Sequence, residues 1–131
     1  MNPTDIESHL SADQVRIIYS DLQNIITSGQ NRVKVLEGIF TQIDGSFSDA
    51  VDAADANNQR TETLADIDRE KQAIRAAQRA LGRIDELGEL GYCSECDVDI
   101  PFKRLKIAPT TTLCVDCKQA QEKFQRIHRH A

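Results

Sequence analysis

The sequence predicts an all-α protein: a long antiparallel coiled-coil hairpin followed by a small four-cysteine module that ends in a C-terminal helix. Apolar residues repeat with heptad spacing over two long stretches, and a cluster of turn-forming residues separates them. Four cysteines then follow as two C-x-x-C pairs. The composition agrees, because only 5% of the residues are aromatic and tryptophan is absent, which leaves little bulk for a large globular core.

The first helix is predicted to begin near residue 12, after an N-terminal arm of residues 1–11 that is frayed or loosely docked. Ser11 and Gln14 have the spacing of a capping box, and Leu10 is placed to pack on Val15 as a hydrophobic staple. The apolar seam then consists of Ile18, Leu22, Ile25, Gly29, Leu36, Ile39 and Ile43, with Val33 beside its one interruption at Arg32. This 4-3 spacing is typical of a coiled coil.

The pattern stops at residues 44–49, whose turn-forming side chains are expected to reverse the chain. A second helix is predicted from about Ala53 to Leu87, with a seam of Leu64, Ile67, Ile74, Ala77, Leu81 and Ile84. A row of arginines on another face is typical of a solvated surface: Arg75, Arg79 and Arg83. Residues 12–90 are therefore predicted to form one hairpin with its tip at about 44–55. The short turn favours pairing of the helices within one chain, and hence a monomer.

The cysteines Cys93, Cys96, Cys114 and Cys117 form two C-x-x-C pairs separated by seventeen residues, which is the spacing of a closed tetrathiolate zinc site. Two disulfides are the alternative. The start of the sequence shows no secretory leader, which favours a reducing cytoplasm and therefore metal. Because four thiolates leave no open position on the ion, we expect one structural Zn²⁺ rather than a catalytic one.

Residues 91–131 are predicted to hold this zinc module and the C-terminal helix. Pro101 and Pro109 disfavour regular helix, so residues 97–113 are predicted to be a ribbon or an irregular loop. A short helix over residues 118–127 is expected to pack back on the base of the hairpin. His128 and His130 follow it and are predicted to be solvated.

Charge and motifs exclude several functions. No apolar run approaches the roughly 18 residues of a membrane span. Residues 1–66 carry four basic and eleven acidic side chains, net −7, against a net +2 in residues 67–131. With a sequence pI near 5.1, this balance argues against nucleic-acid binding as the main activity. No nucleophile or phosphate-loop motif is present, so the protein is predicted not to be an enzyme. A zinc-ribbon module that binds nucleic acid through the basic second half stays as the alternative.

Acidic residues gather at the predicted tip: Asp44, Asp49, Asp52 and Asp55. The residues alone allow two interpretations. The acids can act as turn residues and favour the first turn of the next helix through its dipole, or they can meet a metal or basic groups of a partner. An EF-hand is excluded because the spacing of its ligands is missing.

Several motifs together resemble the DksA/TraR family of bacterial RNA polymerase regulators. The finger segments are GYCSEC at 91–96, Ile100-Pro101, Arg104-Leu105, Pro109 and LCVDCK at 113–118. The tip segment 49–54 has the pattern D-x-x-D-x-A. The resemblance covers about residues 12–125, and the combination is more specific than either motif alone.

The resemblance implies a function. The hairpin of such a protein enters the secondary channel of RNA polymerase, brings the tip near the catalytic centre and alters transcription initiation without sequence-specific DNA contact. It implies Asp49, Asp52 and Ala54 as the tip residues that act in the channel. Zinc would fix the base of the hairpin.

Departures from the family pattern carry expectations of their own. Asp97 stands where the family finger has glycine, so the turn there is expected to be strained or reshaped. Ala50 replaces a common proline, which should loosen the tip. The family's contacts for the alarmone ppGpp fall on Ala76 or Ala77, Ala108 and Lys118, and only Lys118 keeps the family residue. The sequence therefore predicts little or no help from ppGpp, with Lys118 as the residual contact.

Overall fold

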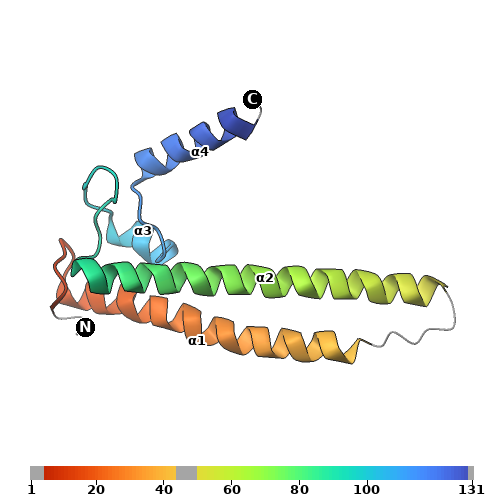
Figure 1. The fold of residues 1–131 in the computed structure, drawn as a ribbon. Coiled ribbons are helices and arrows are strands. Elements are labelled where there is room, and N and C mark those ends of the chain that lie inside the picture. Colours follow the sequence, from red (N-terminus) through yellow and green to blue (C-terminus); the bar gives the residue numbers. More distant parts are fainter. Residues whose placement is uncertain (1–4, 44–49, 130–131) are drawn as a thin grey trace. The chain divides into compact units, whose positions relative to one another are not determined.

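The computed structural model describes residues 5–43 and 50–129. Within these ranges there are four helices and no strand: α1 (Ala12–Gln42), α2 (Ala50–Leu87), α3 (Phe102–Ile107) and α4 (Val115–Arg129) (Figure 1). The predicted all-α class is confirmed. None of these helices is both long and apolar enough to cross a membrane.

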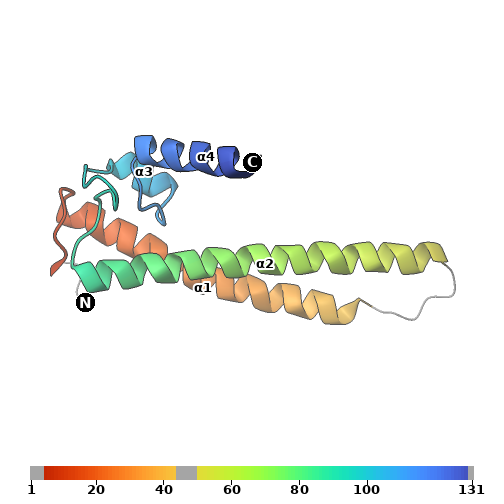
Figure 2. The same cartoon turned by 45° about the horizontal axis from the view of Figure 1, so that its top comes forward.

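Contacts divide the chain into two compact units. The first unit combines Met1–Leu22 with Arg79–Ala131, and the second unit is Gln23–Gln78. Both α1 and α2 contribute residues to each unit. Within each unit the two helices lie side by side and antiparallel (Figures 1 and 2).

Helix α1 begins where the capping box predicts. The backbone N–H of Gln14 donates to Ser11 Oγ at 3.1 Å, and the backbone N–H of Ser11 donates to Gln14 Oε1 at 3.1 Å. These reciprocal bonds satisfy two donors that the helix itself leaves without partners. The first unit then buries an apolar core that includes Val15, Ile18, Leu22, Ala80, Ile84, Leu90, Ile100 and Leu105.

The second unit is held by a smaller core around Val33, Ile67 and Ile74, against which Ile26 and Leu36 pack. Gly29 lets the helices approach closely there, because a Cβ atom on it would lie 2.7 Å from Ile74 Cγ1. The antiparallel pairing is fixed at its surface by Arg32, whose Nε and Nη2 donate to the carboxylate of Glu70 at 2.7 and 3.1 Å.

The seam of the second unit differs from its predicted phase at several positions. Leu64 is 51% exposed, while Thr63 beside it is buried, and its hydroxyl donates to the Gln59 carbonyl at 2.7 Å. On α1, Ile39 is exposed and Val33 is buried. On α2 the buried residue therefore lies one position before the expected Leu64, because a threonine whose hydroxyl bonds its own helix can occupy the seam.

The N-terminal arm docks more closely than a frayed or loosely docked arm would. The Glu7 N–H donates to the Gly88 carbonyl at 2.8 Å, and the Leu90 N–H donates to the Glu7 carbonyl at 3.0 Å. Ser8 Oγ donates to the Leu90 carbonyl at 2.6 Å. His9 Nε2 lies 3.0 and 2.9 Å from two further carbonyls, those of Gly91 and Ile100. Since both neighbours are acceptors, this nitrogen carries the proton.

Two expectations for the C-terminal region are wrong. The segment predicted to be a ribbon or an irregular loop contains α3, which starts directly after Pro101; a proline is tolerated where a helix begins because the N–H it lacks would have no helical partner. Contrary to the expectation, helix α4 does not pack on the base of the hairpin along its length. Every described side chain from Lys118 to His128 is exposed, and only Cys117 is half-buried.

Candidate functional site

The first cysteine pair, Cys93 and Cys96, lies in a tight turn that two backbone hydrogen bonds close. The Cys93 N–H donates to the Val98 carbonyl at 2.9 Å, and the Asp97 N–H donates to the Cys93 carbonyl at 3.0 Å. Asp97 closes the turn with φ of 64°, in the left-handed region that favours glycine. The expectation of a strained turn at Asp97 is therefore confirmed.

The second pair straddles the start of α4. Cys114 precedes the helix and Cys117 lies in its first turn, where the helix dipole favours a thiolate. The Cys117 N–H donates to Cys114 Sγ at 3.5 Å. The two turns are joined by the Ser94 N–H, which donates to the Thr112 carbonyl at 2.8 Å.

The four sulfurs form one cluster. All of them lie within 4.8 Å of one another, and Cys96 Sγ and Cys114 Sγ are 3.7 Å apart. A tetrahedron with Zn–S bonds of about 2.3 Å has sulfur–sulfur edges of about 3.8 Å. The donor set and its spacing therefore fit one zinc ion.

The thiols of the cluster affect one another's protonation. Backbone hydrogen bonding from Cys114 is the largest influence on Cys93 and lowers the pKa of that thiol to about 6. Side-chain hydrogen bonding with Cys114 raises the pKa of Cys117. Four thiolates this close repel one another, so they can all be ionised together only around a positive ion.

Arg104 on α3 supports the second cysteine pair through a hydrogen bond to the residue that precedes it. Its Nε donates to the Leu113 carbonyl at 3.2 Å, next to Cys114, and the same carbonyl accepts from Thr111 Oγ1 at 3.2 Å. Leu105, the following residue, is buried and anchors α3 in the core of the first unit. The finger thus has a hydrogen-bonded support that residue patterns alone did not reveal.

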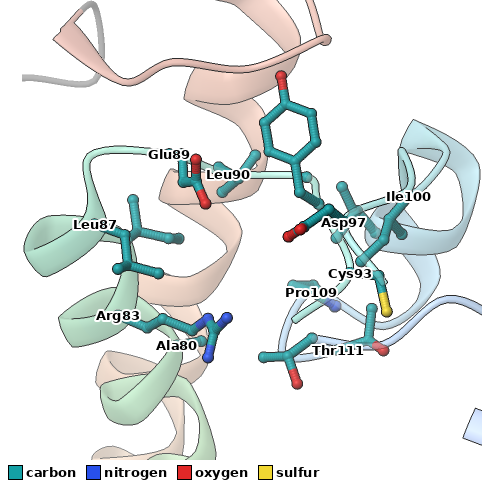
Figure 3. A pocket seen from close by; sticks show the side chains of 15 residues that line it. Ala80, Arg83, Leu87, Glu89, Leu90, Cys93, Asp97, Ile100, Pro109 and Thr111 are labelled. Atoms are coloured by element: carbon teal, nitrogen blue, oxygen red, sulfur yellow. The ribbon is translucent and has the colours of Figure 1, made fainter. Parts of the chain in front are cut away.

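A small cavity lies between the end of α2 and the finger (Figure 3). Ala80 and Arg83 line one side, and Pro109 and Thr111 line the other. Its volume is about 60 Å³, whereas sites for small organic ligands occupy roughly 300–1,000 Å³. The cavity has room for a few water molecules and is too small for a nucleotide.

The predicted tip residues are described in part. Asp52 lies in the first turn of α2 and Ala54 follows in the same helix; both are exposed. Asp49 lies outside the described residues. Asp52 borders a surface hollow of about 400 Å³ in the second unit, lined by Ile39, Gln42, Ile43, Asp52, Asp55, Ala56 and Gln59. The apolar part of this hollow was not predicted, because it depends on how the end of α1 faces α2.

Lys118 and the predicted row of arginines are exposed. Lys118 lies in α4, and Arg75, Arg79 and Arg83 have exposed side chains for which the described part of the chain offers no ion-pair partner. His128 stacks on Phe124 with ring centroids 4.0 Å apart. His130 lies outside the described residues.

Comparison with known proteins gives these features a family. The prokaryotic dksA/traR C4-type zinc finger matches residues 88–123. A solved structure, transcription factor DksA2 from Pseudomonas aeruginosa, is 30% identical and superposes with a TM-score of 0.75 over 87% of each chain. The chain belongs to the DksA/TraR family.

Other DksA relatives match less of their own length. The RNA polymerase-binding transcription factor DksA of Buchnera aphidicola (strain APS) is 29% identical over 88% of this chain and 76% of the relative. The protein of the same name in Escherichia coli K12 is 35% identical over 59% of this chain, and the match spans half of that relative. Membership in the family agrees with a C4-type finger whose cysteines can hold one zinc ion.

Proposed function

We propose that this protein binds bacterial RNA polymerase and regulates transcription without being an enzyme. The observation that carries the proposal is the match to DksA2 over 87% of both chains, because a match of that extent cannot come from the finger alone. The curated relatives are named as RNA polymerase-binding transcription factors, which supports the same partner.

We further propose that the hairpin enters the polymerase secondary channel and acts there through Asp49, Asp52 and Ala54. Support comes from the D-x-x-D-x-A pattern and from the place of Asp52 and Ala54, exposed at the start of α2. A carboxylate in this position can meet basic groups of a partner. In this proposal the protein changes initiation without sequence-specific DNA contact, as a monomer in the cytoplasm.

Zinc has a structural role in this proposal. Cys93, Cys96, Cys114 and Cys117 would hold one ion, which supplies a cross-link between the first turn of α4 and the turn at residues 93–97. With four thiolate ligands the ion keeps no position for a reacting water. The chain's own contribution is to hold the sulfurs together through the backbone bonds around Cys93 and Cys114.

The response to ppGpp is proposed to be weak. Of the positions that the family uses, Ala76 or Ala77 and Ala108 carry no charge, and Lys118 alone offers a cation. A single lysine is a point charge and cannot grip a pyrophosphate as a bidentate arginine can. The test measures how the protein changes transcription from a ribosomal RNA promoter with and without ppGpp. We expect nearly the same change in both reactions, and a much larger change with ppGpp would contradict this proposal.

The decisive experiment compares Asp52→Asn with Asp55→Asn in transcription reactions with purified polymerase. Both variants remove one charge beside the same hollow, but only Asp52 belongs to the tip motif. Asp52→Asn is expected to keep zinc content and polymerase affinity while abolishing the effect on transcription, and Asp55→Asn is expected to act like the parent protein. Loss of polymerase binding by Asp52→Asn would instead assign this residue to docking.

Salt-dependent binding of the isolated protein to DNA tests the alternative function. A nucleic-acid module that neutralises phosphates loses affinity steeply as salt rises. No such binding is expected here. Tight DNA binding with a steep salt slope would favour the nucleic-acid-binding module instead.

A further inference from the structure

Arg60 connects α2 to the end of α1. Its Nη2 donates to the carbonyl of Ile43, just beyond the last residue of α1, at 3.1 Å. Its Nη1 donates to Asn57 Oδ1 at 3.3 Å, one turn earlier on α2. The side chain is half-buried, so its position is constrained by both bonds and by packing.

The end of α1 needs such a partner. The last carbonyls of a helix have no N–H partner within it, and their dipoles favour a nearby cation. Helix α1 has no basic residue in its own last turn. Arg60 therefore supplies from the neighbouring helix the charge that α1 lacks.

This bond lies next to the proposed acting surface. Ile43 and Asp52 line the same hollow, one from the end of α1 and the other from the first turn of α2. Arg60 is not among the residues that line the hollow. It instead fixes the Ile43 side of the hollow to the helix that carries Asp52.

We propose that Arg60 is a positioning residue for the tip: by holding the Ile43 carbonyl, it sets the place of the α1 end relative to Asp52 and so controls how strongly bound protein alters transcription. The inference rests on the proposed function. Arg60 needs no contact with the polymerase for this role. Its loss should therefore lower the effect of bound protein rather than the affinity for polymerase.

Three variants separate the hydrogen bond from packing and from charge. Arg60→Met keeps a long apolar stem without a donor, Arg60→Lys keeps a cationic donor, and Arg75→Met is the control for loss of one exposed arginine on the same helix. The zinc-loaded proteins, each with all 131 residues of this sequence, would be titrated into transcription reactions. The titration gives two quantities: the maximal effect at saturation and the concentration that gives half of it.

Arg60→Met is expected to lower the maximal effect at least about threefold, because misplacing an acting group by about 1 Å can cost up to roughly 100-fold. The half-effect concentration should stay within about twofold of the parent value. Arg60→Lys should restore most of the maximal effect, and Arg75→Met should change neither quantity. An Arg60→Met protein that keeps its maximal effect, or loses only affinity, overturns the inference.

Amide hydrogen exchange provides a readout that does not depend on transcription. In Arg60→Met the amides of Phe40 to Ile43 should exchange roughly tenfold faster, the effect expected for loss of a charged hydrogen bond, while Val33 stays unchanged. Unchanged exchange at Ile43 also overturns the inference. If the parent protein has no effect on transcription, the proposed function fails, and exchange still decides whether Arg60 holds the end of α1.

Discussion

At the scale of single residues, Asp97 is a place where the finger can be stabilised. Its φ of 64° is costly for a residue with a Cβ and costs nothing for glycine. Asp97→Gly is expected to raise the free energy of unfolding by about 0.5–1 kcal/mol, and Asp97→Ala should lower it, because aspartate tolerates this region better than alanine does. Urea unfolding of the zinc-loaded protein measures both changes.

Glu95→Gly is the matched control for this prediction. Glu95 is an exposed acid in the same turn, and its φ is not positive. Glycine there only adds freedom to the unfolded chain, so this variant should be less stable than the parent protein. Equal gains from both glycine substitutions would show that loss of negative charge, rather than backbone strain, explains the result at Asp97.

Arg104 is expected to matter for zinc affinity although it is not a ligand. It holds the Leu113 carbonyl beside Cys114, and loss of such supporting contacts typically lowers metal affinity about 10- to 100-fold. We expect Arg104→Met to bind zinc about tenfold more weakly in competition with a chromogenic chelator. Lys103→Met, which changes an exposed lysine on the same short helix, should bind zinc as tightly as the parent protein does. Equal zinc affinity of the two variants would contradict a supporting role for Arg104.

At the scale of the helices, Gly29 and Gly38 form a natural pair for testing how α1 packs. A Cβ on Gly29 would lie 2.7 Å from Ile74 Cγ1, whereas a Cβ on Gly38 would meet nothing within 4 Å. Gly29→Val should destabilise the protein by about 1–3 kcal/mol through overpacking. Gly38→Ala should stabilise it by up to about 1 kcal/mol, because alanine favours a helix over glycine. Thermal unfolding distinguishes the signs, and a stabilising Gly29→Val would contradict the close approach.

The sequence predicted the helices better than their contacts. The Ser11–Gln14 capping box placed the start of α1, and the end of the second helix at Leu87 is confirmed, because both depend on local residues. The burial of Thr63 in place of Leu64 depends on a hydroxyl bond to Gln59, which no hydrophobic pattern contains. Helix α3 differs from the predicted ribbon or irregular loop because Pro101, which disfavours the interior of a helix, lies directly before its first residue.

In the candidate site, too, the features that depend on local sequence could be predicted, and those that depend on the placement of the helices could not. The clustering of the four cysteines followed from their spacing, because each C-x-x-C pair brings its two sulfurs together locally. Arg60 could not be singled out from a chain with 16 basic residues, and Arg104, although part of a finger segment, could not be assigned its supporting contact. Each acts through one carbonyl, and the position of that carbonyl is known only once the helices are placed.

At the scale of the whole molecule, zinc is expected to matter unequally for the two units. All four cysteines belong to the first unit. Among the described side chains of α4, residues 115–128, only that of Cys117 is half-buried, and the others are exposed. A helix of 15 residues is marginal in water without tertiary packing. Removing zinc with a strong chelator should therefore unfold α4.

Hydrogen exchange followed by mass spectrometry would measure this difference. After zinc removal, peptides from residues 115–129 and 91–100 should exchange much faster, while peptides around Val33 and Ile67 should stay protected, because the second unit has its own core. Restoring zinc should restore protection. Equal loss of protection in both units would show that they fold as one cooperative body.

The docking of the N-terminal arm also constrains the order of events while the ribosome makes the chain. Ser8 bonds to a carbonyl 82 residues later, and His9 bonds to one 91 residues later. Chains emerge N-terminus first, at roughly 5–20 residues per second, so residues 5–9 must wait for several seconds before their partners exist. Residues 5–9 are thus made early but are among the last to reach their native contacts, and a ribosome stalled before residue 88 should carry them undocked.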